Sequence, residues 1–169
     1  MLFRNLRAQT ALAIASLAVT VTGWALPSDR EQPINIQADA AEQVMQEGRE
    51  TTVYTGSVIM TQGSMLIEGD EVTIFSKERT VTKIVAVGKP AHFKQQSEQE
   101  QPPVKAYAQR INYDLNGETI VLFDEASLLQ GGDTISGKRI DYNIATEQVK
   151  AASTNDTRVN IVLEPKKNP

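Results

Sequence analysis

Few residues of this chain have the type and spacing that catalysis or metal binding requires. The only histidine, His92, stands beside Phe93, and the sequence contains no cysteine. A structural or catalytic zinc site needs several such ligands, so a lone histidine predicts none. The acidic pairs Asp70-Glu71 and Asp124-Glu125 are adjacent residues, and neighbours on a strand point to opposite faces. They therefore indicate solvated turn charges rather than a general acid and base, and His92 indicates a surface residue of a strand.

Glycine patterns and overall charge exclude further classes of function. Neither G-x-x-x-x-G-K nor G-x-G-x-x-G is present, and no serine stands in a nucleophile elbow, so the glycines indicate turns and strand starts. The 169 residues carry 21 acidic and 17 basic side chains, a net charge of -4. This balance argues against nucleic-acid binding, which needs a basic face. The sequence thus predicts neither an enzyme nor a cofactor.

The first 25 residues have the pattern of a cleaved signal peptide. Arg4 and Arg7 precede an apolar stretch over residues 11–21, and small residues lead to a cleavage site after Ala25. Cleavage removes two arginines and no acidic residue, which leaves 15 basic and 21 acidic side chains and a net charge of -6. The alternative is an uncleaved membrane anchor, because the uncharged residues 8–28 are about long enough to cross a bilayer.

A four-residue phrase recurs along the rest of the chain: a small residue, two polar or small residues, then an aliphatic residue or alanine. In the last three copies another apolar residue follows two positions later. Spacing of two is the strand period, so each copy predicts the start of a strand with one apolar face. Such recurrence is typical of a repeated β unit. The copies begin at Ala38, Gly69, Ala108 and Gly137.

Turn signals at short intervals favour antiparallel pairing, because the connections are too short for crossover helices. Asn116-Gly117 is typical of a hairpin turn, and residues 130–140 match residues 62–72 at a constant offset. Residues 95–103, rich in glutamine, glutamate and proline, predict a mobile loop. Residues 38–45 could form one helical turn, but no segment after the signal shows a convincing helical period. The pattern predicts an all-β sandwich or roll.

Apolar strand faces are the remaining candidates for function. Most of them pack a core, but only 5% of the residues are aromatic, so few large side chains are available to fill a long interior. A roll with a slot between its sheets could admit acyl chains. The first strand near Ile34 and the last strand near residues 159–163 are the natural sheet edges.

Three motifs carry a resemblance to a known family. They are Gln-Pro-Ile-Asn-Ile-Gln-Ala-Asp at residues 32–39, Thr-Gly-Ser-Val-Ile-Met-Thr-Gln-Gly at residues 55–63, and Gly-Lys-Pro-Ala-His-Phe at residues 88–93. With them, residues 30–165 resemble the periplasmic lipopolysaccharide-transport bridge proteins of the LptA type, within the OstA-like family. The second motif recurs widely in that family, and the combination of the first and third is more specific.

The resemblance implies a fold and a role. The fold is an antiparallel, slightly twisted β-jellyroll shaped like an open V, over residues 26–165. It follows the signal peptide at residues 1–25 and precedes a basic tail at residues 166–169. The apolar interior would shield the acyl chains of lipopolysaccharide in the periplasm, without catalysis. The resemblance also implies that four residues face the lipid: Ile34, Ile36, Phe93 and Leu115.

The resemblance also implies protein partners. Units would stack end to end through strand edges and link an inner-membrane subunit of the LptC type to the N-terminal domain of an outer-membrane translocon of the LptD type. Two alternatives remain open. An anchored subunit of the same pathway would retain residues 8–28 as a membrane helix. A structural or carbohydrate-binding β-sandwich would need surface aromatic platforms, and the only tryptophan, Trp24, lies inside the signal.

Overall fold

The computed structural model describes residues 29–96, 102–153 and 158–165. The predicted signal peptide, the basic tail and residues 97–101 of the predicted loop lie outside these ranges. No helix within the described ranges is long and apolar enough to span a bilayer. The elements are η1 (Asp29–Glu31), β1 (Ile34–Gln37), β2 (Ala40–Gln46), β3 (Arg49–Gln62), β4 (Met65–Lys77), β5 (Thr80–Gln95), β6 (Val104–Asp114), β7 (Thr119–Gln130), β8 (Asp133–Asn143), β9 (Gln148–Ala152) and β10 (Asn160–Val162).

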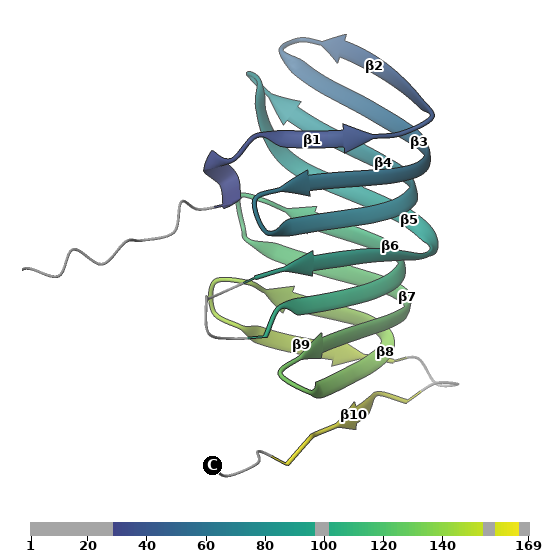
Figure 1. The fold of residues 1–169 in the computed structure, drawn as a ribbon, viewed down its shortest axis with the longest axis vertical. Helices are drawn as coiled ribbons and strands as arrows, with labels where there is room; N and C mark the ends of the chain where they lie inside the picture. The colour runs from purple at the N-terminus through teal and green to yellow at the C-terminus, as the bar shows by residue number, and fades with distance from the viewer. Residues whose placement is uncertain (1–28, 97–101, 154–157, 166–169) are drawn as a thin grey trace, which may run out of the picture.

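All ten strands belong to one antiparallel sheet, which confirms the predicted pairing and fold class. Strands β3 to β8 follow one another as hairpins and stack along the long axis of the molecule (Figure 1). At one end, β1 pairs with the last part of β3 and β2 pairs with its first part. At the other end, β10 and β9 pair in the same way with the two parts of β8.

Each long strand bends in its middle at a register shift, and the burial pattern changes there. In β4, Met65 and Ile67 are buried before the bend, Val72 and Ile74 are buried after it, and residues 70–71 between them are exposed. A bulge bends its strand and breaks the alternation of faces in this way. The other shifts in the middle of strands lie between Thr55 and Val58, Val87 and Ala91, Tyr107 and Arg110, and Phe123 and Ala126.

The bends fold the sheet into two half-sheets that face each other across the core. Half-sheet 1 contains β1, β10 and residues 58–62, 65–69, 91–95, 104–108, 126–130 and 133–137. Half-sheet 2 contains β2, β9 and residues 49–55, 71–77, 80–87, 110–114, 119–123 and 139–143. The bends form the closed side of the V, and the turns between strands lie along its open side.

Three of the four copies of the repeated phrase mark bends and not strand starts, so the prediction is wrong for them. Three copies lie inside β4, β6 and β8, and the copy at Ala38 spans the connection between β1 and β2. The apolar spacing restarts after each bend although the strand continues. The small first residue has a steric reason, because a Cβ on Gly69 would lie 2.7 Å from the carbonyl oxygen of Val87. The possible helical turn at residues 38–45 is instead mostly strand β2.

The core is made by rows of paired residues that run from strand to strand along the whole stack. Their middle members are buried and their end members are more exposed, so the core opens toward solvent at both ends. The row in half-sheet 1 is Ile36, Met60, Ile67, Phe93, Ala106, Leu128, Ile135 and Ile161. A row in half-sheet 2 is Ala41, Tyr54, Val72, Ala86, Ile111, Leu122, Ile140 and Ala151.

Candidate functional site

The structure places all four predicted site residues against one core. Phe93 is 0% exposed and Leu115 is 7% exposed, and both belong to the buried cluster. Ile34 and Ile36 are half-buried and pack against it from the edge strand β1. Ile36 and Phe93 share the row of half-sheet 1, whereas Leu115 follows β6 in half-sheet 2. Their contact with lipid stays a prediction.

A contact between aromatic rings joins the two half-sheets. Phe93 and Tyr113 pack edge to face, with ring centroids 5.9 Å apart and planes at 73°. Burial raises the pKa of the Tyr113 phenol above its ordinary value of 10.0, and a hydrogen bond with the Arg30 side chain offsets part of that rise. The phenol is therefore neutral at physiological pH. Sequence reasoning placed Tyr113 on an apolar face but did not assign it to the site.

The interior is filled in its middle and hollow at its ends. Tyr142, Phe93, Met60 and Ile111 are almost completely buried there. The expectation of an interior left unfilled by large side chains is therefore wrong for the middle, because aliphatic residues supply the volume that aromatic residues would take. An acyl chain can run along this core only if the half-sheets move apart or side chains change their packing.

The hollow at the N-terminal end has a volume of about 330 Å³ and lies between the half-sheets at the open side. Its apolar wall includes Ile34, Val81 and Leu115, and Arg30 and Arg79 contribute its cationic part. Two of the four predicted site residues therefore line one cavity. No sequence pattern predicted Val81 or Arg79 as residues of this site, because both become neighbours of Ile34 only through the folded sheet.

A second hollow of about 420 Å³ lies at the C-terminal end of the interior. Leu128, Ile135 and Val149 supply its apolar wall, and Asp133 and Glu147 supply carboxylates. Ile135 is the neighbour of Ile161 on β10, so this hollow continues the row of half-sheet 1. Both ends of the interior thus combine an apolar wall with charged residues at the mouth.

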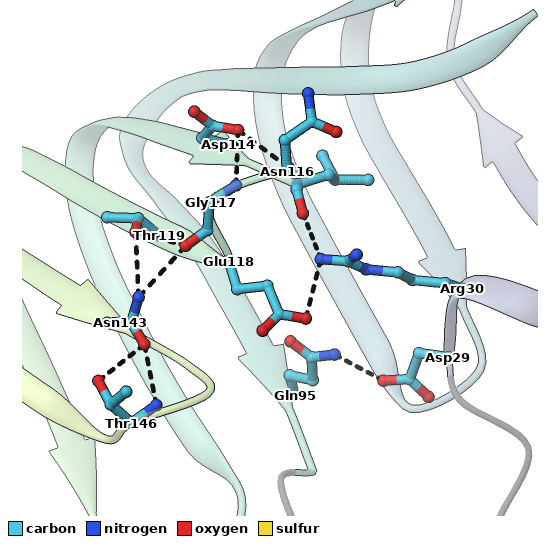
Figure 2. Close-up of polar contacts among 11 residues, drawn as sticks. Asp29, Arg30, Gln95, Asp114, Asn116, Gly117, Glu118, Thr119, Asn143 and Thr146 are labelled. Carbon is cyan, nitrogen blue, oxygen red and sulfur yellow. Dashed lines mark hydrogen bonds and ion pairs between the residues drawn. The ribbon is translucent and has the colours of Figure 1, made fainter.

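Asp29 and Arg30 cross the open side of the V, as Figure 2 shows. A guanidinium nitrogen of Arg30 donates to the carbonyl oxygen of Leu115 and lies 3.2 Å from Oε1 of Glu118, and both residues belong to the turn between β6 and β7 at the open side of half-sheet 2. The carboxylate of Asp29 accepts hydrogen bonds from half-sheet 1. Its donors are the Ser64 N–H at 2.7 Å, the Ser64 hydroxyl at 2.7 Å and Gln95 Nε2 at 2.8 Å.

Strand edges and exposed apolar residues coincide at the ends of the stack. The strand order of half-sheet 1 ends at β1 and β10, as predicted for the first and last strands. Half-sheet 2 ends at β2 and β9, which the sequence analysis did not identify as edges. Exposed apolar side chains gather on or next to β2 and β10: Val44 is 57% exposed, Met45 70%, Ile161 55%, Val162 51% and Leu163 69%.

The residues that first suggested chemistry lie away from the interior. His92 faces outward from half-sheet 1, with Nδ1 2.8 Å from Oε2 of Glu68 and its ring stacked on Tyr107 at 4.6 Å. His92 thus lies on the outer face of a strand, as predicted, but its side chain is only 20% exposed. Asp124 and Glu125 are exposed at the bend of β7, with positive φ angles of 59° and 53°. In the part of the chain that the structure describes, no three His, Asp or Glu side chains group as metal ligands would.

Known proteins are similar to this chain in sequence and in fold. Residues 35–148 match the family model described as "LptA/(LptD N-terminal domain) LPS transport protein". The lipopolysaccharide export system protein LptH of Pseudomonas aeruginosa is 37% identical over 151 residues, which are 85% of each chain. The lipopolysaccharide export system protein LptA of Escherichia coli K12 is 33% identical over 156 residues, covering 91% of this chain and 83% of its relative.

The crystal structure of LptH from Pseudomonas aeruginosa, described as the LptA homologous periplasmic component of the lipopolysaccharide transport device, superposes with a TM-score of 0.73. It is 35% identical in sequence, and the match covers 82% of this chain and 100% of that one. Sequence and fold agree, and the residues that match the family model include all of the bent strands β3 to β8. The chain therefore belongs to the LptA and LptD N-terminal domain family of lipopolysaccharide transport proteins.

Proposed function

We propose that this protein is a periplasmic carrier that binds the acyl chains of lipopolysaccharide between its half-sheets and forms one unit of a bridge between the two membranes. One observation carries the proposal. Apolar residues pair from strand to strand through the entire stack, from the half-buried Ile36 on β1 to the exposed Ile161 on β10. The names of its relatives as lipopolysaccharide export proteins support the ligand class.

The physical chemistry of the interior suits a carrier. Burial of an acyl chain in an apolar environment contributes about 0.8 kcal/mol per CH₂ group. An open V shields only part of each chain, so binding would be favourable and reversible. Ile34, Ile36, Phe93 and Leu115 would contact the lipid, because all four belong to the apolar core or pack against it, and Ile34 and Leu115 also line the N-terminal hollow. No step in this role requires a catalytic group.

Strand edges would join the units and their partners. An exposed edge carries unpaired N–H and C=O groups and can pair with another sheet edge. We assign one contact to the β1 and β2 end and the other to the β9 and β10 end. Self-association would use both ends, and an inner-membrane subunit of the LptC type and a translocon of the LptD type would each cap one end.

Export to the periplasm rests on the signal-peptide pattern of residues 1–25, and N-terminal sequencing tests it. A mature chain that starts at Leu26 supports the carrier, whereas an intact N-terminus favours the alternative of an anchored subunit. Mass spectrometry of the protein purified from its native envelope under non-denaturing conditions tests the ligand. The proposal expects lipopolysaccharide masses, and protein free of lipid in transporting cells would contradict it.

A further inference from the structure

The segment Asp29–Gln32, here called the strap, connects the two half-sheets at the N-terminal end of the open side. On the side of half-sheet 1, Asp29 is bonded to Ser64 in the turn between β3 and β4 and to Gln95. On the side of half-sheet 2, Arg30 is bonded to Leu115 and Glu118 in the turn between β6 and β7. Figure 2 shows the contacts of Asp29 with Gln95 and of Arg30 with Glu118. The sheet's own hydrogen bonds join the half-sheets only through the bends. The strap therefore adds a second connection on the side where the V is open.

The attachment to half-sheet 1 is extensive. Gln62, which is only 7% exposed, donates from Nε2 to the carbonyl oxygens of Arg30 and Gln32 at 3.3 and 3.0 Å. Gly63 adopts a positive φ of 56°, and a Cβ there would lie 3.0 Å from the Cα of Asp29 and would clash with its carboxylate. The turn between β3 and β4 is thus shaped to hold Asp29.

The attachment to half-sheet 2 is smaller but ends on a well-defined turn. Asp114 accepts the N–H groups of Asn116 and Gly117 at 2.9 and 3.1 Å, and Asn143 donates to the Gly117 carbonyl at 3.2 Å. Glu118 lies in this turn. The side chains of Arg30 and Glu118 are 45% and 42% exposed, and such ion pairs are screened by solvent and weak. The strap would therefore release first from half-sheet 2.

The position of the strap relates it to the entry of lipid. It lies over the 330 Å³ hollow, which Arg30 lines together with Ile34 and Leu115. It also leads directly into β1, which carries Ile34 and Ile36. Because the middle of the interior is filled, an acyl chain needs a wider separation of the half-sheets, and a connection across the open side opposes that widening.

We propose that the strap fixes the separation of the half-sheets at this end, with Asp29 and Arg30 as positioning residues, and that release of Arg30 from half-sheet 2 widens the interior for an acyl chain. The role in lipid entry rests on the proposed function. The role in fixing the separation does not, and the two are tested by different measurements.

The first measurement is made without lipid. The chain has no cysteine, so Lys105→Cys in half-sheet 1 and Lys77→Cys in half-sheet 2 introduce the only thiols for spin labels. Both lysines are exposed at the open side: Lys77 is the last residue of β4 and Lys105 is the second residue of β6. We expect a narrow distance distribution in the parent protein and a broader, longer one with Arg30→Gln. The matched control is Arg139→Gln, since Arg139 is also paired with a carboxylate, Asp141, but on the same strand.

The second measurement adds purified lipopolysaccharide. In a separate protein carrying Arg30→Cys and Glu118→Cys, a short bis-maleimide bridge makes the connection permanent. The bridge should slow lipopolysaccharide uptake several-fold relative to the same protein with its two thiols capped singly. Arg30→Gln should speed uptake, and Arg139→Gln should leave it unchanged.

The outcomes separate the two claims. If the distances between the spin labels do not change with Arg30→Gln, the strap does not fix the separation of the half-sheets, whatever the result with lipid. Distances that respond while no form, the parent included, takes up lipopolysaccharide would support the fixed separation and refute the proposed function. If the bridged protein took up lipopolysaccharide as fast as the protein with singly capped thiols, the claim that Arg30 must be released from half-sheet 2 would be wrong.

Discussion

Phe93 and Tyr113 come from opposite half-sheets and meet edge to face at 5.9 Å in the middle of the core. Phe93 stands in the row that begins at Ile36, and Tyr113 also contacts Arg30 of the strap. The same pair therefore belongs to the packing that closes the V and to the surface that the proposed ligand would use. A carrier of this kind must open a core that also stabilises its fold.

Replacement of Phe93 by alanine should show how much this packing stabilises the protein. Phe93→Ala removes a fully buried ring from the core, and such truncations destabilise proteins by about 3–5 kcal/mol. The matched control is Phe123→Ala, because Phe123 lies on the outer face beneath Arg139 and is only half-buried. Chemical denaturation should show the larger loss for Phe93→Ala, and equal losses would contradict the packing described here.

Alkaline pH should destabilise the protein in part through Tyr113. Its pKa is raised in the folded state, chiefly by burial. The unfolded chain therefore loses the phenolic proton first, and the stabilisation present below the unfolded pKa of about 10 is lost as the pH rises above it. Denaturation midpoints measured from about pH 8 to about pH 11 should fall less steeply for Tyr113→Phe than for the parent protein. If the midpoints of the two proteins fell in parallel with pH, Tyr113 would not contribute to the loss of stability at alkaline pH.

Ile36→Asp should weaken lipid loading without unfolding the protein. Ile36 is half-buried on an edge strand, so a carboxylate there reaches solvent in the lipid-free protein but would be desolvated beside an acyl chain. Asn35→Asp adds the same charge on the opposite face of β1 and serves as the control. Bound lipopolysaccharide per protein should fall only for Ile36→Asp, and unchanged loading would remove Ile36 from the site.

A chain that ends at Ser153 should self-associate more weakly and keep its fold. It lacks β10, whose residues are all exposed and pair only with β8 within the described residues. The N-terminal end and half of the C-terminal end stay intact, so the effect should be a lower affinity and not a different assembly. Sedimentation velocity over a range of concentrations measures it. Association as strong as that of the full chain would exclude β10 from the contact between units.

Local sequence patterns predicted the strands and their pairing, because alternation with a period of two and short turns are local properties. The bends could not be predicted in this way. In Gly69-Asp70-Glu71-Val72, the polar pair and the restarted apolar spacing are compatible with a new strand and with a bulge inside one strand. The repeat was a correct observation with the wrong structural meaning.

The site residues also differ in whether a local sequence pattern predicts them. Sequence motifs were enough to predict Ile34, Ile36 and Phe93 as site residues. Val81, Arg79 and Arg30, which line the same hollow as Ile34, are brought together only by the folded sheet. Strand β2 shows why exposed edges are hard to predict. All its residues are exposed, so no burial pattern marks it, and its pairing with β3 alone makes it a strand. The contact of Arg30 with Glu118 has no local signal either.

Photocrosslinking from β1 tests the central claim most directly. A photoreactive amino acid at position 36 points into the interior, and the same group at position 35 points outward beside Thr61. In cells that are exporting lipopolysaccharide, we expect an adduct of lipopolysaccharide at position 36 and little or none at position 35. Absence of an adduct at position 36, or equal adducts at both positions, would contradict an interior that carries the acyl chains.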